Sequence, residues 1–228
     1  MATLLITGAN RGIGFCLARV ALERGWRVLG SARTHAQAEE TAAVLGAGFT
    51  PLVFDVTDRD GLRRAAAARG EAIDVLINNA GIIGPKPEDQ STLHMDFDGF
   101  LETLAVNTLA PLAVAQAFLP HLRRAPGARI LTVSSQMAYM GYAKSDRIAY
   151  RASKAAVNKV MQGLATDLAA EAIAVGLVDP GWVQTDMGGP EAELAPATVA
   201  TGILDLAEGL DMSRTGRFFK WTGEERPF

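Results

Sequence analysis

The chain contains a single cysteine among its 228 residues, so no disulfide can form within it. Cysteine and histidine also do not cluster at the spacing of a zinc site, and no metal is expected. Cys16 lies among apolar residues of a helical pattern, where a small core residue is a better interpretation than a reactive thiol. This composition fits a reducing compartment, and we expect a cytoplasmic protein.

The chain also lacks a large excess of charge of either sign. The formal net charge is −3 and no long basic run occurs, so we expect no nucleic-acid partner. The N-terminal apolar run, residues 1–8, is too short for a signal peptide and predicts a strand. The most apolar long stretch, residues 104–122, is interrupted by Asn107, Gln116 and two prolines, which favours a largely buried helix over a membrane span.

Short apolar runs alternate with helical patterns along the whole chain. Strands are expected at residues 3–7, 27–32, 50–55, 74–78, 129–133, 173–178 and 217–221. Helices are expected at residues 13–25, 34–45, 57–69, 96–124 (with a kink at Pro111 or Pro120), 150–170 and 196–209. The alternation predicts one α/β domain over residues 1–228, with a doubly wound, Rossmann-type parallel sheet of about seven strands and helices on both faces.

Three glycines separate the first strand from the first helix. Gly8, Gly12 and Gly14 would let the backbone turn tightly and approach a pyrophosphate, which the N–H groups and positive dipole end of the helix would bind. Their G-x-x-x-G-x-G spacing departs from the common dinucleotide fingerprint. A glycine-rich turn with only a packing role is the alternative.

The second predicted strand ends without a carboxylate. Sites that prefer NAD place an acidic residue there, on the ribose 2′-hydroxyl, whereas this chain has Ala32 followed by Arg33. Arg11 stands inside the glycine loop, and two guanidiniums near the ribose would suit a 2′-phosphate. The pattern predicts NADPH over NADH, unless these arginines only face water.

Further polar residues fall at strand ends or inside apolar segments. The run Asn78-Asn79-Ala80-Gly81 would let a flat ligand pass close, or forms a purely structural turn. Asn107, in an apolar helix, demands partners and is alternatively a structural amide. Ser135 could donate to a carbonyl oxygen, while strand alternation turns Ser134 to the opposite face.

Tyr150 and Lys154 stand four residues apart in a helical segment, on one face and one turn apart. A phenol has a reference pKa of about 10, and a nearby ammonium would bring that pKa toward the working range. The pair therefore indicates acid–base chemistry, although the spacing alone also arises by chance.

Together these residues resemble the short-chain dehydrogenase/reductase family over nearly the whole chain. The motifs that carry the resemblance are Thr7-Gly8-x-x-x-Gly12-x-Gly14, Asp55, Asn78-Asn79-Ala80-Gly81, Asn107, Ser135, Tyr150-x-x-x-Lys154 and Pro180-Gly181-x-x-x-Thr185. Residues 150–156 and 180–189 are similar to a narrower branch of C-factor-like signalling proteins and small carbonyl reductases.

The resemblance implies a role for each matching position. Tyr150 would be the general acid, Lys154 would lower the pKa of that phenol and bind the nicotinamide ribose, Ser135 would polarise the carbonyl, and Asn107 would hold a water that links Lys154 to solvent. Beside Tyr150 and Lys154, the cofactor-binding residues would be Gly8, Asn10, Arg11, Gly12, Ile13, Gly14, Arg33, Asp55, Val56, Asn79, Ala80, Gly81, Pro180, Gly181, Val183 and Thr185.

The expected activity is NADPH-dependent reduction of a small aldehyde or ketone. Substrate loops are expected at residues 82–95, 136–149 and 186–199, whose Met, Ile, Tyr and Pro favour an apolar or aromatic carbonyl compound. The alternatives are a nucleotide-bound signalling protein with secondary activity, and NAD-dependent alcohol oxidation, against which the missing carboxylate argues. The resemblance also implies a homodimer or homotetramer through the long helices, 96–124 and 150–172, unless these fold wholly into their own subunit.

Overall fold

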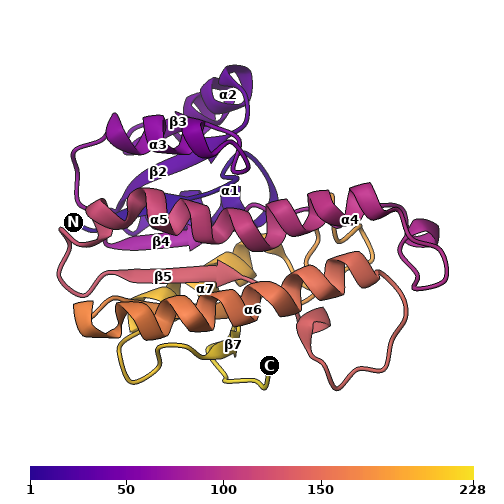
Figure 1. Cartoon of the computed structure of the whole chain (residues 1–228). Coiled ribbons are helices and arrows are strands. Elements are labelled where there is room, and N and C mark those ends of the chain that lie inside the picture. Colours follow the sequence, from indigo (N-terminus) through magenta and orange to yellow (C-terminus); the bar gives the residue numbers. More distant parts are fainter.

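A seven-stranded parallel sheet forms the centre of the protein (Figure 1). The computed structural model describes all of residues 1–228. The strands are β1 (Thr3–Ile6), β2 (Arg27–Ala32), β3 (Phe49–Val53), β4 (Val75–Asn78), β5 (Arg129–Val133), β6 (Ala174–Asp179) and β7 (Phe218–Lys220). Their order is β3-β2-β1-β4-β5-β6-β7, which confirms the doubly wound sheet. The order reverses between β1 and β4, and ligands bind at such switch points.

Helices cover both faces of the sheet. They are α1 (Gly12–Glu23), α2 (His35–Leu45), α3 (Arg59–Ala67), α4 (Phe97–Leu104), α5 (Ala110–Leu122), α6 (Ile148–Leu168) and α7 (Pro196–Gly209), with short helical turns at Pro87–Asp89, Gln136–Ala138 and Ala169–Glu171. Figure 1 shows α5 and α6 in front of the sheet and α7 behind it. Because connections run from carboxyl ends of strands into these helices, the loops that carry polar motifs gather at one edge.

Successive residues of each strand enter opposite cores. Leu4 and Ile6 of β1 pack with α1 and α7, whereas Leu5 between them packs with α3, α5 and α6. The same alternation places Ile77 of β4 on one face and Leu76 on the other. Both faces are therefore dry, which explains why the strands are apolar throughout rather than at every second position.

The expected helix 96–124 is one continuous rod with an irregular turn. Phe97–Leu122 includes a π-helical segment, Ala105–Leu109, in which the Ala110 N–H donates to the Ala105 carbonyl. The irregularity precedes Pro111, which has no N–H to give to a helical ladder. It carries Asn107 in its middle and turns that side chain inward.

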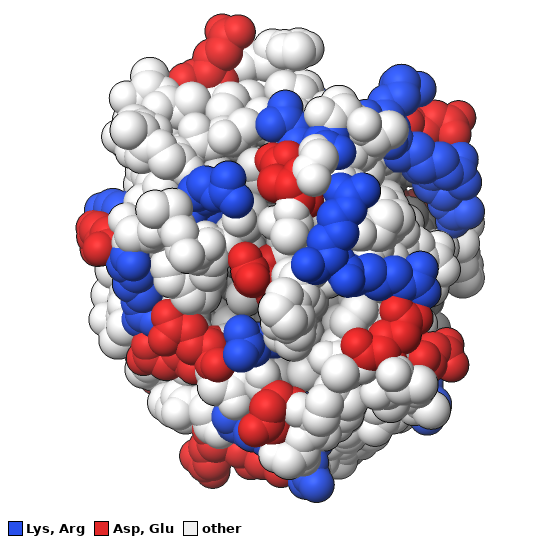
Figure 2. Space-filling model, turned by 90° about the vertical axis from the view of Figure 1, so that its left-hand side faces the viewer, with Lys and Arg blue, Asp and Glu red and all other residues white.

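By length and composition, the rod Phe97–Leu122 meets the usual test for a membrane-spanning helix, as core helices of soluble proteins also do. Its Val114, Phe118 and Leu122 are buried in the core against the sheet. Figure 2 views the molecule from the amino ends of the strands, where acidic and basic side chains are interspersed. That face therefore carries no extended field of one sign.

Candidate active site

The glycine loop after β1 has a backbone that only glycine allows. Gly8 and Gly12 have φ values of +68° and +55°, and a Cβ on Gly14 would lie 2.1 Å from the Gly8 carbonyl oxygen. The first turn of α1 receives no side-chain cap from Arg11, so its N–H groups are open. A close backbone cradle with free donors and a positive dipole end fits a pyrophosphate.

Asn79 fixes this loop from the end of β4. Its amide Nδ2 donates to the carbonyls of Thr7 (3.0 Å) and Gly8 (3.2 Å). The Thr7 hydroxyl accepts the N–H groups of Asn79 (3.0 Å) and Ala80 (3.1 Å) in return. The Asn79 side chain therefore builds the turn, and a cofactor in this groove would meet the backbone around Ala80 and Gly81.

The adenosine side differs from expectation in one respect. Arg33 is exposed just beyond β2 and forms no ion pair, so its guanidinium is available there. Arg11 instead pairs with Asp186 across the groove, at 2.7 Å. The reason is geometric, because the loop after β6 folds over the glycine loop, and the Thr185 Cγ2 lies 3.3 Å from the place of a Cβ on Gly12.

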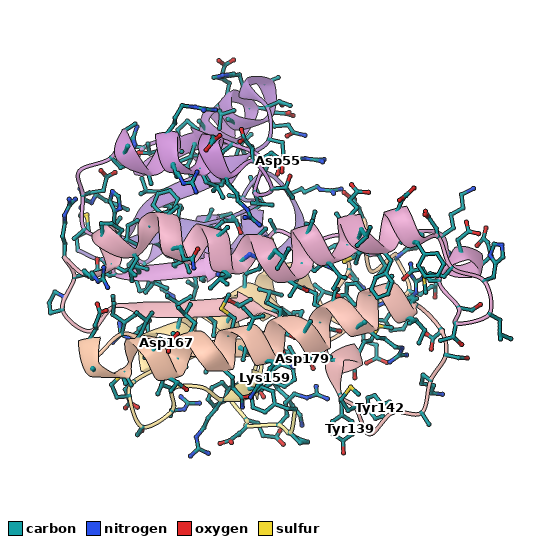
Figure 3. The ribbon with its side chains drawn as sticks, viewed as in Figure 1. Asp55, Tyr139, Tyr142, Lys159, Asp167 and Asp179 are labelled. Atoms are coloured by element: carbon teal, nitrogen blue, oxygen red, sulfur yellow. The ribbon has the colours of Figure 1, made fainter.

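Asp55 follows β3 and is seen at its end in Figure 3. Burial raises the pKa of Asp55, but hydrogen bonds from the Thr57 hydroxyl and N–H outweigh it and, with the nearby Arg33 guanidinium, lower the pKa overall. One oxygen of the Asp55 carboxylate thus accepts both hydrogen bonds from Thr57, two residues further along the same turn. Val56, half-buried beside it, packs against the apolar core on that face of the sheet.

Lys154 is buried at the carboxyl end of β5. Its ammonium donates to the Val133 carbonyl at 2.8 Å and forms no ion pair. Burial alone lowers the Lys154 pKa from 10.5 to about 8. A buried cation with spare donors is suited to hold hydroxyl groups of a ligand.

Tyr150 lies one turn earlier on α6 and is 8% exposed. Burial raises its pKa to about 12, while a hydrogen bond with Ser135 acts in the opposite direction. The Lys154 Nζ lies 5.7 Å from the Tyr150 ring centroid. Desolvation of the phenolate is thus the main cause of the raised Tyr150 pKa in this structure, and the role expected for Lys154 stays a prediction.

Ser135 and Ser134 point to opposite sides, as strand alternation predicts. The Ser134 hydroxyl donates to Asn158 Oδ1 at 2.6 Å, inside the packing of α6. The Ser135 hydroxyl caps the turn Gln136–Ala138, accepting the Met137 N–H at 3.1 Å, on the Tyr150 side. Ser135 is thus the serine of the pair that lies on the Tyr150 side.

The Asn107 side chain is satisfied within the protein. Its Oδ1 accepts the Ile82 N–H at 2.9 Å, and its Nδ2 donates to the Ile82 carbonyl at 2.8 Å and to Ser153 Oγ at 3.0 Å. A Cβ on Gly81 would lie 3.2 Å from this Oδ1 and 3.6 Å from Lys154 Nζ. These hydrogen bonds make Asn107 a clamp of the loop beside Lys154, and its expected role toward a water molecule stays a prediction.

The loop after β6 closes the other side of the groove. Gly181 has a φ of +75°, and Val183 is buried in a bridge to Leu194. The Thr185 hydroxyl donates to the Val183 carbonyl and accepts the Gly188 N–H. The segment that contains Pro180, Gly181, Val183 and Thr185 is therefore one folded strap, and its Thr185 lies against Gly12 of the glycine loop.

Sequence reasoning missed two polar residues of this site. Gln90 is fully buried, and its amide donates to the Ile83 carbonyl while accepting the Tyr150 N–H, so it ties the loop 82–95 to α6. Asp179, the last residue of β6, accepts N–H groups on both sides of the groove. A carboxylate directly before Pro180, at the end of an apolar strand, was the available signal for Asp179.

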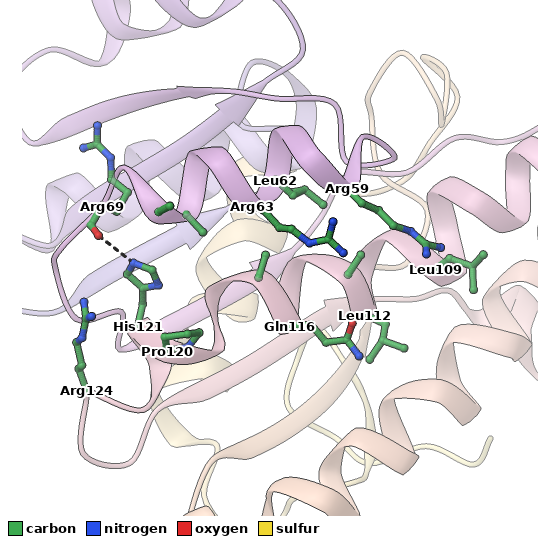
Figure 4. Close-up of a pocket in the computed structure, with 14 residues that line it drawn as sticks. Arg59, Leu62, Arg63, Arg69, Leu109, Leu112, Gln116, Pro120, His121 and Arg124 are labelled. Carbon is green, nitrogen blue, oxygen red and sulfur yellow. Dashed lines mark hydrogen bonds between the residues drawn. The ribbon is translucent and has the colours of Figure 1, made fainter.

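A separate cavity lies away from this groove. It has a volume of about 620 Å³, runs between α3 and α5, and is lined by arginines such as Arg59 and Arg63 together with His121 (Figure 4). None of the site residues predicted from the sequence lines it. Arg63 and Arg69 are paired with Asp60 and Glu71, so their charges are largely neutralised.

Comparison with known proteins agrees with this geometry. The family model described as short chain dehydrogenase matches residues 2–194. The C-signal protein of Myxococcus xanthus is 40% identical over 158 residues, covering 68% of this chain and 93% of that protein. Serine 3-dehydrogenase of Agrobacterium fabrum is 34% identical over 188 residues, covering 81% of this chain and 73% of that protein.

Solved structures extend the comparison to the whole chain. The carbonyl reductase Sniffer of D. melanogaster superposes with a TM-score of 0.91 at 29% identity, covering 100% of both chains. An NADPH-bound carbonyl reductase from chicken fatty liver has a TM-score of 0.90 at 28% identity, covering 100% of this chain and 99% of that chain.

Burial of Lys154 predicts a pH-dependent stability difference from Lys154→Met. Because the folded-state pKa, about 8, lies below the unfolded value of 10.5, folding disfavours the ammonium at neutral pH and this penalty fades as pH rises. The unfolding free energy of the variant minus that of the wild type should fall by about 2 kcal/mol between pH 7 and pH 10. Chemical denaturation at several pH values measures this difference.

The matched control is Lys159→Met, an exposed lysine of the same helix, whose stability difference should not change with pH. A pH-independent difference for Lys154→Met would contradict the buried charge.

Proposed function

This chain is a member of the short-chain dehydrogenase family of oxidoreductases, and from that premise we propose that it uses NADPH to reduce the carbonyl group of small aldehydes or ketones. The observation that carries the proposal is the convergence of Tyr150, Ser135 and Lys154 at the carboxyl end of β5. The site faces a glycine cradle suited to a pyrophosphate. Carbonyl reductases among the structural neighbours support the reaction class.

Each residue has a distinct task in this proposal. The nicotinamide supplies the hydride when it is bound. Tyr150, protonated at neutral pH because its pKa is about 12, donates its proton to the substrate oxygen as negative charge develops there. The Ser135 hydroxyl holds the same oxygen, and the Lys154 ammonium binds the ribose hydroxyls and stabilises charge near Tyr150.

NADPH is the proposed cofactor because of the end of β2. No carboxylate stands there, and the exposed, unpaired Arg33 is placed for a 2′-phosphate. Structures similar to this chain include one of a Burkholderia multivorans short-chain dehydrogenase/reductase with bound NADP, at 29% identity and a TM-score of 0.90. Arg11 would contribute only after release from Asp186.

The substrate is proposed to be apolar or aromatic. Several of the exposed large apolar side chains lie in or beside the predicted substrate loops, namely Leu93, Met140, Tyr142, Trp182 and Met187. The rings of Tyr139 and Tyr142 meet edge to face, with their centroids 5.0 Å apart. Figure 3 shows the two side chains in the loop before α6. Such exposed apolar groups around a polar reaction centre favour a compound with one carbonyl and an apolar body.

Replacing Tyr150 with Phe tests the proton donor. The variant keeps the ring and its packing but loses the hydroxyl, so kcat/KM for carbonyl reduction should fall at least about 100-fold. Steady-state NADPH oxidation measures the loss. Tyr142→Phe is the control, because it removes a hydroxyl from the predicted substrate loop but keeps the apolar ring proposed to contact the substrate. Unchanged turnover in Tyr150→Phe would remove this residue from the mechanism.

The same variant separates the second candidate function, a nucleotide-bound signalling protein, which the 40% identity to C-signal favours. A signalling effect that survives in Tyr150→Phe without turnover would make the reductase activity secondary.

Replacing Arg33 with Asp tests cofactor choice. The change removes the cation proposed for the 2′-phosphate and adds a repelling charge, so kcat/KM for NADPH should fall about 10- to 100-fold while that for NADH does not fall. Arg63→Asp, on the exposed surface of α3, serves as the control. A preference that Arg33→Asp leaves unaltered would place the 2′-phosphate elsewhere.

The long helices are proposed to join subunits in a homodimer or homotetramer. Phe97 and Leu101, one turn apart on α4, are 74% and 64% exposed and have no partner in their own subunit. Leu101→Glu should therefore shift the protein toward monomers in sedimentation velocity, whereas Val44→Glu, an equally exposed apolar position on α2, should not. A wild-type protein that sediments as a monomer would refute this interface.

A further inference from the structure

Asp179 joins two loops that face each other across the reaction centre. It ends β6, is 4% exposed, and its Oδ1 accepts the N–H groups of Gln136 and Gly181, each at 3.0 Å. Gln136 directly follows Ser135, and Gly181 begins the strap over the groove. Figure 3 shows Asp179 behind α6, at the end of its strand. One carboxylate oxygen thus sets the distance between the two sides of the site.

The second oxygen of Asp179 pairs with Arg226, from the segment after β7. The Arg226 side chain is 11% exposed, and its guanidinium lies 5.4 Å from the Phe218 ring centroid. Its backbone N–H donates to the Phe218 carbonyl at 2.9 Å. The cation is therefore held by β7 independently of the ion pair, and it reaches the site from the far end of the chain.

The pair also sets the charge behind the proton donor. Burial is the main cause that raises the pKa of Tyr150, and the negative charge of Asp179 raises it further. The Ser135 hydrogen bond and the Arg147 guanidinium lower that pKa, and Lys154 lies over the ring. Without Arg226, the carboxylate would act on Tyr150 with its full charge through a low-dielectric core.

We propose that Asp179 and Arg226 are a positioning pair for the reduction. Asp179 fixes the loops that carry Ser135 and Gly181, and Arg226 neutralises its charge so that Tyr150 releases a proton at the right stage. The inference rests on the proposed function, in which Tyr150 is the proton donor. A buried ion pair that only stabilises the fold is the competing explanation.

Substitutions of the pair separate geometry from charge. Asp179→Asn keeps an oxygen that accepts both N–H groups but removes the negative charge, which lowers the pKa of Tyr150. Arg226→Gln removes the positive charge and keeps a donor for Asp179, which raises that pKa. The double variant Asp179→Asn/Arg226→Gln restores neutrality, with two amides that can pair. Arg226→Lys retains the cation and is the conservative control.

The pH profile of kcat/KM for NADPH-dependent reduction is the first readout. Activity should fall at high pH in two steps, first as Lys154 loses its charge around its pKa of about 8 and then as Tyr150 loses its proton. The midpoint of the Tyr150 step should move down in Asp179→Asn and up in Arg226→Gln, each by about half a pH unit or more. The double variant and Arg226→Lys should return it near the wild-type value. Loss of the Asp179 contacts to both loops, in Asp179→Ala, should lower kcat about tenfold or more.

A second readout works without turnover. Tyr150 is one of three tyrosines, so in a Tyr139→Phe/Tyr142→Phe background a ring-carbon label on tyrosine gives a single NMR resonance. Its titration should begin at lower pH in Asp179→Asn and at higher pH in Arg226→Gln. The NMR titration tests the positioning pair even if the protein reduces no carbonyl compound. That second outcome would refute the proposed function but not the pair.

Opposite shifts that cancel in the double variant support the positioning pair. If the Tyr150 titration shifts in the same direction in both single variants, the proposal is wrong. If it does not shift in folded variants whose thermal stability is lowered, the pair is only a structural ion pair. If Arg226→Gln does not fold, the comparison of Asp179→Asn with the double variant still tests the sign, because the double variant should titrate later.

Discussion

One buried cation, the Lys154 ammonium, is the constraint on which the candidate active site depends. It lies inside the protein with the Val133 carbonyl as its acceptor and no carboxylate beside it. A pKa near 8 in place of 10.5 corresponds to a cost of about 3 kcal/mol at neutral pH. The two apolar cores on either face of the sheet hold α6 in place against that cost. Stability is thus given up where a charge lies beside Tyr150, a pattern typical of functional sites.

Close backbone approach is the second constraint of the site. The loops after β1, β4 and β6 meet so tightly that side chains are missing where they touch. A Cβ on Gly8 would lie 3.3 Å from Ala80, and one on Gly81 would approach both Asn107 and Lys154. Asn79 and Asn107 use their amides to hold backbone segments. The polar residues of the groove therefore divide into those that shape it and those, such as Ser135, that are free to face a substrate.

Local pattern was enough to predict the sheet and the residues on α6. Continuous apolar strands separated by helical stretches require a parallel sheet, and the four-residue spacing of Tyr150 and Lys154 survives in any helix. The pKa of Tyr150 could not be predicted from the sequence, because it depends on how deeply the side chain is buried. The Arg11–Asp186 and Arg226–Asp179 ion pairs also could not be predicted, because they depend on how segments far apart in the sequence fold over one another. The π-turn around Asn107 likewise needs the surrounding packing as well as Pro111.

The chain is similar both to C-signal and to carbonyl reductases. The central claim is therefore that this site reduces a carbonyl compound. The most direct measurement is NADPH oxidation by the purified protein across a panel of apolar and aromatic aldehydes, ketones and diketones. The account predicts protein-dependent NADPH oxidation with at least one of them, together with the matching alcohol as product. A protein that binds NADPH but oxidises it with no member of the panel would contradict the account.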